Sequence, residues 1–210
     1  MEHIHPIQPI AVIILAIVLW YMRKKKLAAQ GPASGSKDGQ ARPGIQRPAK
    51  QADPPEVVYA NLRRKAFMTS PQNLGPAGDV KEDEAYGVVM EMGISDSVLT
   101  LACFADGDAG LYYQSGGGMK GGGAHENVRK AAKDFVALSQ KVIPRMTKAT
   151  GDPALPESGK VSFYALTPKG LLTTQVDREA LGESHPLAPL FYAGQEVVGQ
   201  MRQVQAEKAS

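Results

Sequence analysis

The chain has 210 residues, which suffices for one ordinary domain of ~100–150 residues with an appendage and argues against two large domains. Its composition, 43% hydrophobic and 21% charged, is globular, but 22 glycines, 15 prolines and only 6% aromatic residues indicate a sizeable part outside any packed core. The single cysteine, Cys103, excludes an intramolecular disulfide framework and a cysteine-rich zinc site.

The net charge of +3 is distributed unevenly along the chain. Residues 1–22 carry −1, residues 23–65 carry +8 from 11 basic and three acidic side chains, and residues 66–210 carry −4 from 13 basic and 17 acidic ones. The basic character therefore belongs to a tail. A folded domain that binds nucleic acid has its positive charge on the folded part, so we expect no nucleic-acid partner.

Residues 1–26 are predicted to form a transmembrane anchor with a basic stop. Residues 4–22 are almost entirely apolar, and as a helix they span ~28 Å, close to the ~30 Å hydrocarbon core of a bilayer. Trp20 and Tyr21 stand at the end of this stretch, where aromatic rings favour the headgroup level. A buried helix of a soluble core is the alternative, but the chain that follows offers such a helix no core to enter.

Four consecutive cations follow the apolar stretch: Arg23, Lys24, Lys25 and Lys26. The positive-inside rule places them on the cytoplasmic side, so we expect the N-terminus outside and the rest of the chain in the cytoplasm. The same cations are expected to contact anionic lipid. A cleavable signal peptide carries its positive charge before the apolar segment rather than after it, which argues against cleavage here.

Residues 27–52 are predicted to be a disordered linker. They contain four glycines and three prolines, no aromatic residue, and only Leu27 and Ile45 as large aliphatic side chains. Such a segment cannot bury enough surface to offset its ordering entropy. A flexible chain of this length has a root-mean-square span of ~25–30 Å, so it would keep the following domain near the membrane.

Residues 53–210 are predicted to form a single domain that begins with a short helix. Asp53 is the expected N-cap of this helix, with a proline in the first turn and a glutamate three residues on. Val58, Leu62 and Ala66 then fall on one apolar stripe. Three strand-like runs follow and predict an antiparallel meander, over residues 86–92, 98–104 and 111–113.

The second half of the domain is predicted to add a helix, a hairpin and a last helix. Apolar residues at three- and four-residue steps predict a helix over 126–146, which bends or ends near Pro144. The hairpin pairs 161–166 with 171–176, and the last helix runs over about 186–203. Leu138 and Phe191 are expected in the core. The predicted fold is therefore α+β: a five-stranded antiparallel sheet (a three-strand meander plus a hairpin) with two main helices and a short N-terminal helix, after an N-terminal transmembrane helix.

Several blocks of this domain resemble a widespread family of bacterial proteins of unknown function. They are YGVVMEMG at residues 86–93, LYY at 111–113 with the following glycines and His125-Glu126, HPLAPLF at 185–191, and AGQE at 193–196. The resemblance covers roughly residues 60–202. It implies a bacterial source, hence an inner-membrane location for the anchor, and one intact domain, but no activity.

The glycine-rich segment SGGGMKGGGAHE, at residues 115–126, is the most distinctive feature. Its G-x-G-x-x-G spacing, after a strand and before a helix, suits an anion held by backbone N–H groups and the helix dipole. The tentative anion-binding residues are Gly118, Lys120, Gly121, Gly122, Gly123 and His125. Against this, the dinucleotide-binding fold and the Walker pattern are both absent. A close-packed connection that needs positive φ is the favoured alternative.

Other chemistry-bearing residues give weaker signals. The His125-Glu126 pair lacks the second histidine of a metalloprotease helix, and Cys103 lies in an apolar strand as a buried structural thiol would. Asp106 and Asp108 lack the later glutamate of a calcium loop. Glu91 is the one carboxylate among the apolar residues of its strand, although alternation could equally place it on a solvated face. We therefore predict no catalytic residue, no metal and no cofactor.

These features together predict a single-pass, membrane-tethered cytoplasmic protein that acts as a non-enzymatic interaction or regulatory module. Its expected partners are the lipid bilayer, through residues 4–22 and the four cations, and an unknown protein. The alternative is a sensor domain that binds an anionic small molecule or nucleotide at the loop 116–123. An enzyme that uses His125 and Glu126 is a third hypothesis.

Overall fold

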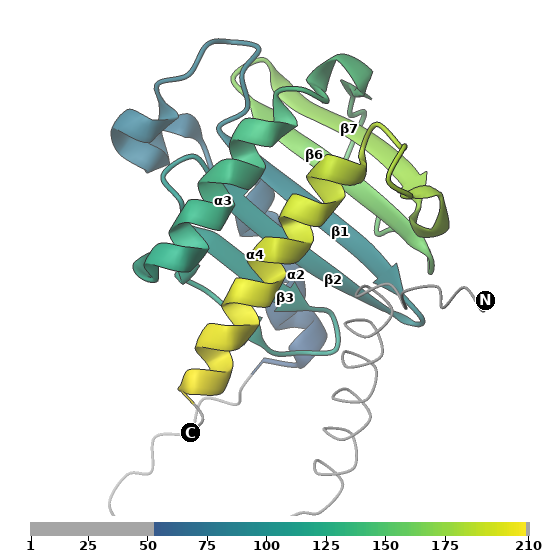
Figure 1. The fold of residues 1–210 in the computed structure, drawn as a ribbon. Helices are drawn as coiled ribbons and strands as arrows, with labels where there is room; N and C mark the ends of the chain where they lie inside the picture. Colours follow the sequence, from purple (N-terminus) through teal and green to yellow (C-terminus); the bar gives the residue numbers. More distant parts are fainter. Residues whose placement is uncertain (1–52, 209–210) are drawn as a thin grey trace, which may run out of the picture. The chain divides into compact units, whose positions relative to one another are not determined.

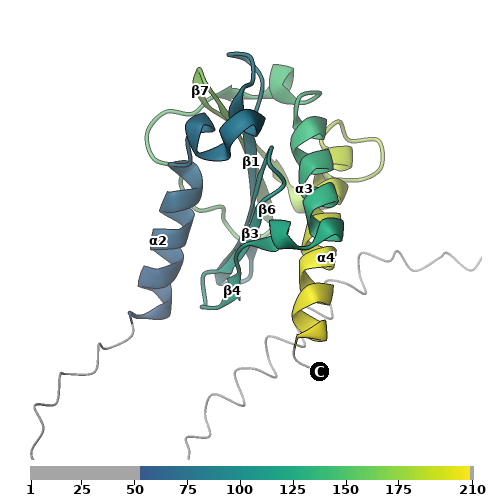
Figure 2. The same cartoon turned by 90° about the vertical axis from the view of Figure 1, so that its left-hand side faces the viewer.

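A seven-stranded antiparallel sheet organises the protein in the computed structural model, which describes residues 53–208. The strand order is β4-β3-β2-β1-β6-β7-β5. Helices α3 and α4 lie side by side on one face of the sheet, and α2 lies on the other (Figures 1 and 2). The helices are α2 (Pro55–Phe67), α3 (Glu126–Ser139) and α4 (Ala188–Glu207), and the strands are β1 (Gly87–Ile94), β2 (Ser97–Phe104), β3 (Ala109–Tyr113), β4 (Gly118–Met119), β5 (Thr147–Lys148), β6 (Lys160–Thr167) and β7 (Gly170–Asp177).

Strand β1 lies at the centre of the sheet and joins its two halves. It pairs with β2 on one side, where Glu91 is opposite Thr100, and with β6 on the other, where Glu91 is opposite Ser162. The predicted meander is therefore β1-β2-β3, and the predicted hairpin is β6-β7. Because side chains alternate along a strand, this register places Glu91 and its two partners on the same face of the sheet.

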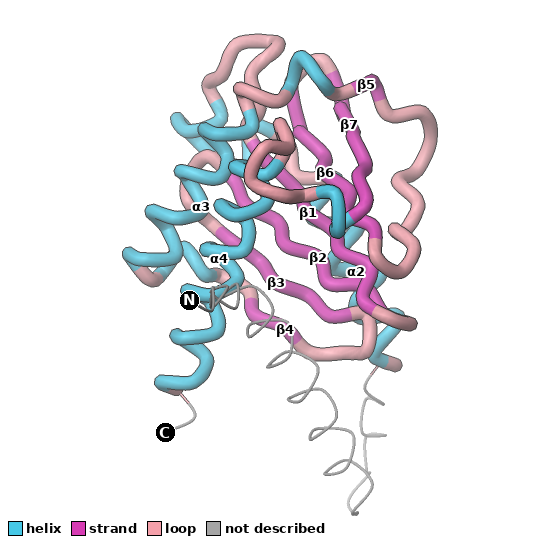
Figure 3. Tube along the Cα trace, turned by 45° about the vertical axis from the view of Figure 1, so that its right-hand side comes forward, coloured by secondary structure: helices cyan, strands magenta, loops and turns pink. Residues whose placement is uncertain are grey.

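The prediction of a five-stranded sheet is wrong, because two short edge strands complete it. Strand β4 lies within the glycine run and pairs with β3, and strand β5 pairs with β7 (Figure 3). Each has only two residues, too few to give the period-two alternation from which strands are recognised. Each short strand covers part of the outer edge of a longer one.

The helices differ in detail from those predicted. Pro54, not Asp53, is the N-cap of α2, and no side chain caps that end. The helix predicted over 126–146 ends at Ser139, and a 3-10 turn, Ile143–Arg145, contains Pro144. Helix α4 extends to Glu207, one turn beyond the prediction. Termination before Pro144 follows from its missing N–H and from the restriction that it places on the preceding residue.

An apolar core fills the space between the sheet and the helices α3 and α4. Its largest fully buried side chains include Phe135, Phe163 and Leu190. Of the expected core residues, Phe191 is buried, whereas Leu138 is half-buried at the margin. Gly194 lets α4 lie close to β1, because a Cβ there would stand 2.7 Å from the Met90 Cε. Close packing of α3 and α4 thus keeps this face of the central strands out of contact with water.

No helix within residues 53–208 is long and apolar enough to cross a membrane. The predicted transmembrane anchor, 1–26, and the predicted linker, 27–52, lie outside the described residues. Their assignment therefore stays a prediction from the sequence.

Candidate functional site

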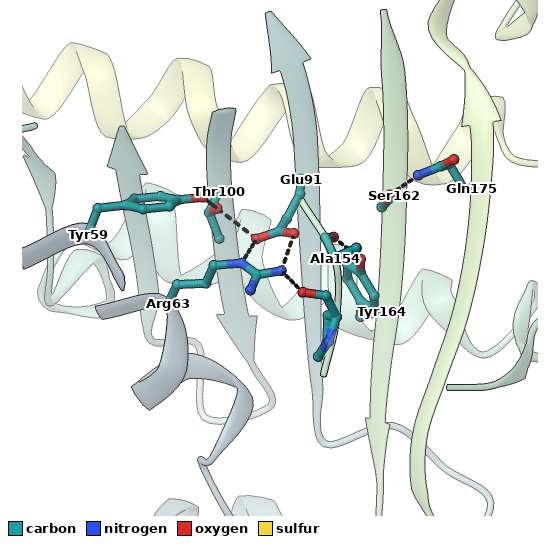
Figure 4. Close-up of polar contacts among 9 residues, drawn as sticks. Tyr59, Arg63, Glu91, Thr100, Ala154, Ser162, Tyr164 and Gln175 are labelled. Carbon is teal, nitrogen blue, oxygen red and sulfur yellow. Dashed lines mark hydrogen bonds and ion pairs between the residues drawn. The ribbon is translucent and has the colours of Figure 1, made fainter. Parts of the chain in front are cut away.

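A cluster of polar side chains is buried between α2 and the sheet. Tyr59 and Arg63 are one helical turn apart on α2, and they face Glu91 on β1 and Thr100 on β2 (Figure 4). The side chain of Glu91 is fully buried, and that of Arg63 is 16% exposed. Alternation along β1 explains the position of Glu91, because Met90 and Met92 point to the opposite, apolar face.

The four side chains form one continuous hydrogen-bonded chain. The Arg63 guanidinium donates from Nε to Oε1 of Glu91 at 2.6 Å and from Nη2 to Oε2 at 2.9 Å. Oγ1 of Thr100 donates to the same Oε1 at 2.9 Å and lies 2.8 Å from the Tyr59 hydroxyl. Because Thr100 uses its proton on Glu91, the Tyr59 hydroxyl donates to Thr100. The buried carboxylate thus accepts three hydrogen bonds, two of them from a bidentate guanidinium.

The loop between β5 and β6 covers the rest of this cluster. Arg63 Nη2 also donates to the carbonyl oxygen of Pro153 at 2.8 Å, and the Tyr164 hydroxyl donates to that of Ala154 at 3.2 Å. The same loop lies close against β1, since a Cβ on Gly93 would be 1.9 Å from the carbonyl oxygen of Glu157. The α2 layer, defined here as α2 and the loop 149–159, therefore covers this face of the sheet.

The electrostatics of the cluster favour a fixed protonation state. Burial raises the pKa of Tyr59 to about 12, so this hydroxyl stays protonated at neutral pH. Burial alone would lower the pKa of Arg63, but the hydrogen bond and charge of Glu91 raise it above its ordinary value. Burial and the charge of Glu91 raise the pKa of Tyr164. Arg63 and Glu91 therefore form an ion pair of zero net charge that holds α2 against the sheet. Neither tyrosine acts as a proton acceptor at neutral pH.

The glycine-rich segment is built into the sheet and the core. Gly118 lies in β4 with a φ of 143°, and its carbonyl oxygen accepts a hydrogen bond from Gln205 of α4. Gly121 has a left-handed φ of 68°. Gly122 is buried, and a Cβ there would stand 2.9 Å from Val128 Cγ1. Lys120 is exposed. Gly118 and Gly121 thus provide the positive φ that the chain needs here, and Gly122 allows close approach of the backbone to Val128.

Three amides at the predicted anion site, those of Gly123, Ala124 and His125, already have partners within the chain. The N–H of Gly123 donates to Oδ1 of Asp108 at 3.3 Å. The N–H groups of Ala124 and His125 donate to the carbonyl oxygens of Gly121 and Gly122. This geometry supports the close-packed connection more than the anion site.

An open hollow lies beside this segment, at the start of α3. Its lining residues are Asp106, Asp108, Gly123, Ala124, Arg129 and Lys133. Asp106 Oδ1 accepts from the N–H of Asp108 at 2.9 Å, and Arg129 Nε donates to the carbonyl oxygen of Gly123 at 2.8 Å. Two carboxylates and two cations offset each other there, so the hollow favours neither an anion nor a metal ion. Within residues 53–208, no group of three or more candidate ligands is arranged to hold a metal.

The remaining chemistry-bearing residues have structural positions. His125 is the N-cap residue of α3 but makes no side-chain cap hydrogen bond, whereas Nδ1 of His185 accepts from the N–H of Leu187 at 3.2 Å. Cys103 is fully buried, and this burial raises the pKa of its thiol. Glu126 is exposed and lies 3.5 Å from Arg129. His125 and Glu126, the residues of the enzyme hypothesis, thus lie at the start of α3 as its N-cap residue and as an exposed partner of Arg129.

Sequence reasoning singled out Glu91 but missed Tyr59, Arg63 and Thr100. Tyr59 and Arg63 are four residues apart and so lie on one side of a helix, and this spacing indicates that they face the same part of the fold. The apolar stripe through Val58 predicted a different inner side of the helix instead, so the spacing of Tyr59 and Arg63 was not used.

Comparison with family models, with curated proteins and with solved structures found no match to this chain. The resemblance to a bacterial family of unknown function therefore stays a prediction.

Proposed function

We propose that this protein is a single-pass, membrane-tethered cytoplasmic interaction module that docks through the outer surface of α2. The outer α2 surface is defined by Val57, Val58, Arg64, Lys65 and Met68. The observation that carries the proposal is its concentration of exposed, large apolar side chains. Such groupings on a protein surface are typical of sites that bind a protein or a membrane.

The exposure of these side chains is unusual for the described residues. Val57 is 45% exposed, Val58 41% and Met68, the C-cap of α2, 73%. They are three of the four large apolar side chains that are strongly exposed within residues 53–208. The fourth, Leu155, lies in the loop 149–159 and so belongs to the same α2 layer. All four therefore lie on the side of the sheet that α2 covers.

The buried cluster determines which side of α2 faces outward. Tyr59, Arg63 and Ala66 lie on the inner side, where Tyr59 and Ala66 are buried and Arg63 binds Glu91. Val58 was predicted for that inner stripe, but the polar contacts of Tyr59 and Arg63 turn it outward. The ion pair thus presents the outer α2 surface in one fixed orientation, as a docking surface requires.

A photo-crosslinking experiment tests this proposal whatever the occupant. Benzoylphenylalanine replaces Met68 in the full chain expressed in bacterial cells, and the matched control carries it at Gln203, an exposed position on α4. We expect illumination to yield protein or lipid adducts at Met68 and several-fold fewer at Gln203. Equal yields at the two positions, or none at either, would show that the outer α2 surface is not the docking surface.

A further inference from the structure

We propose that the occupant of the outer α2 surface is the anionic surface of a lipid bilayer. This inference rests on the proposed function and names its partner. In the docked state, the apolar side chains of Val57, Val58 and Met68 enter the boundary between headgroups and acyl chains. Arg64 and Lys65 lie over the lipid phosphates. The helix then lies in the plane of the interface, as amphipathic membrane-surface helices do.

The arrangement along α2 suits this geometry. Val57 and Met68 are 11 residues apart and so fall on the same side of the helix, about three turns from each other. Arg64 lies between them on that side, and Lys65 lies next to it. Two apolar side chains, with Arg64 between them and Lys65 beside it, therefore face outward, while Tyr59 and Ala66 face the sheet.

The charge of this surface is complementary to anionic lipid. Arg64 and Lys65 are exposed, and within residues 53–208 neither forms an ion pair; Arg64 only donates a hydrogen bond to Asn61 at 3.4 Å. Residues 53–208 as a whole have 16 basic and 19 acidic side chains, a net charge of −3. An anionic membrane thus repels the domain in general and attracts it at this surface, which selects one orientation.

The position of α2 in the chain brings it to the membrane. It starts at Pro55, directly after the predicted linker, whose root-mean-square span of ~25–30 Å sets the reach from the predicted anchor. Tethering of this kind gives an effective concentration of about the millimolar order. Three apolar side chains and two cations bind a membrane only weakly on their own, but a weak second contact suffices beside a first anchor.

A second copy of the chain fits the outer α2 surface less well than an anionic bilayer does. In a two-fold symmetric pair the same patch contacts itself, so Arg64 and Lys65 of the two copies would lie near one another. Such like-charge contact opposes association. An acidic protein partner would satisfy the same charges, and the experiment below separates that occupant from lipid.

The test places an environment-sensitive fluorophore on the full chain reconstituted into vesicles. A Met68→Cys variant is labelled with a nitrobenzoxadiazole group, and Cys103 does not compete because it is fully buried. Vesicles contain either phosphatidylcholine alone or phosphatidylcholine with phosphatidylglycerol. We expect a blue shift, and quenching by brominated acyl chains, only with phosphatidylglycerol. A label at Gln203→Cys on α4 is the matched control and stays solvent-exposed in both.

Charge variants measure the electrostatic contribution to the docking of α2 on the membrane. Replacing Arg64→Gln and Lys65→Gln together removes two cations, and at about 1 kcal/mol each this lowers the docking equilibrium constant roughly 30-fold. The conservative pair Arg64→Lys and Lys65→Arg keeps docking. Circular dichroism confirms that each variant is folded. Unchanged docking in the Gln variant contradicts the electrostatic mechanism.

The outcomes distinguish this inference from the proposed function. If the Met68 label does not respond to anionic vesicles but crosslinking at Met68 in cells captures a protein, the lipid inference is wrong and the interaction module stands. If neither signal appears, both are wrong. If the Gln203 label responds as strongly as the Met68 label, the orientation assigned to the domain is wrong.

Discussion

The two faces of the sheet are covered in different ways. Under α3 and α4 lies the larger apolar cluster, which includes Phe135, Phe163 and Leu190, and the one buried polar side chain of α3, Ser139, bonds to its own helix. Under α2 the apolar cluster is smaller, and beside it lie the ion pair of Arg63 and Glu91 and its hydrogen-bonded neighbours. Within residues 53–208, every buried side-chain nitrogen or oxygen has a hydrogen-bond partner, so the buried polar groups on both faces of the sheet are satisfied.

The two coverings of the sheet therefore have different roles, one in the stability of the domain and the other in the orientation of α2. Apolar burial is non-directional and contributes in proportion to the area removed from water. A buried bidentate ion pair adds little net stability, because desolvation offsets its attraction, but it permits only one placement of the two side chains. We therefore expect the α3 and α4 face to supply most of the stability and the α2 face to fix how α2 is presented.

The largest expected effect comes from the apolar face. Phe135→Ala removes a fully buried ring between α3 and the sheet and leaves a cavity, so the free energy of unfolding falls by ~3–5 kcal/mol. Urea denaturation of the full chain in detergent, followed by near-ultraviolet circular dichroism of its tyrosines, measures this loss. A loss below about 1 kcal/mol would show that this face does not dominate the stability.

Breaking the ion pair is the next largest change. Arg63→Met leaves the fully buried Glu91 carboxylate with only the hydrogen bond from Thr100. Removal of one partner of a buried pair costs ~3–5 kcal/mol, and we expect the lower end because the Arg63 side chain is 16% exposed to water. Chemical denaturation of the variant checks this value.

The double variant Arg63→Met, Glu91→Leu is the control for that experiment. With both charges gone, no uncompensated charge remains, and only the Thr100 hydroxyl and the Pro153 carbonyl lose a hydrogen-bond partner. Stability therefore returns to within about 1 kcal/mol of the parent or exceeds it. A double variant as unstable as Arg63→Met alone would mean that the ion pair itself provides stability. The orientation argument for α2 would then lose its basis.

Tyr59→Phe gives a smaller change whose sign depends on pH. Near pH 8 the variant loses the hydrogen bond to Thr100, which costs about 1 kcal/mol. The pKa of Tyr59 is raised by burial to about 12, so between about pH 10 and 12 the unfolded chain has released a proton that the folded chain keeps. Stability due to Tyr59 therefore falls as pH rises through that window, and the variant avoids this loss. Parallel denaturation curves near pH 8 and pH 11 test it; an unchanged difference between the two proteins contradicts the assignment.

The two faces also differ in how far they follow from the sequence. Helices α3 and α4 are recognisable because their apolar residues recur with the period of a helix, and the long strands because they are short runs of mainly apolar residues bounded by turn residues. Phe191 was expected in the core and is buried. The edge strands β4 and β5 were missed, because two residues carry no period and their pairing depends on neighbours distant in sequence.

The candidate site was the harder part to predict. Glu91 stood out as a carboxylate among apolar residues, but its partner is 28 residues away on α2 and no local pattern connects them. The stripe through Val58, Leu62 and Ala66 misplaced the inner face of α2, because only Ala66 of these is buried there. Apolar periodicity fails where the inner side of a helix is held by polar groups.

The smallest expected effect is on the outer side of α2. The double variant Val57→Ser, Met68→Ser removes two side chains that are 45% and 73% exposed, so little buried area is lost and the free energy of unfolding stays within about 0.5 kcal/mol of the parent. Both faces of the sheet keep their contacts. If the same variant abolishes both the crosslinks at the neighbouring Val58 and the lipid response of a label at Asn61→Cys, an exposed uncharged position of α2, the apolar side chains act in docking and not in folding. A loss of stability as large as that of Arg63→Met would instead place Val57 or Met68 within the fold, and the division of α2 into an inner and an outer side would be wrong.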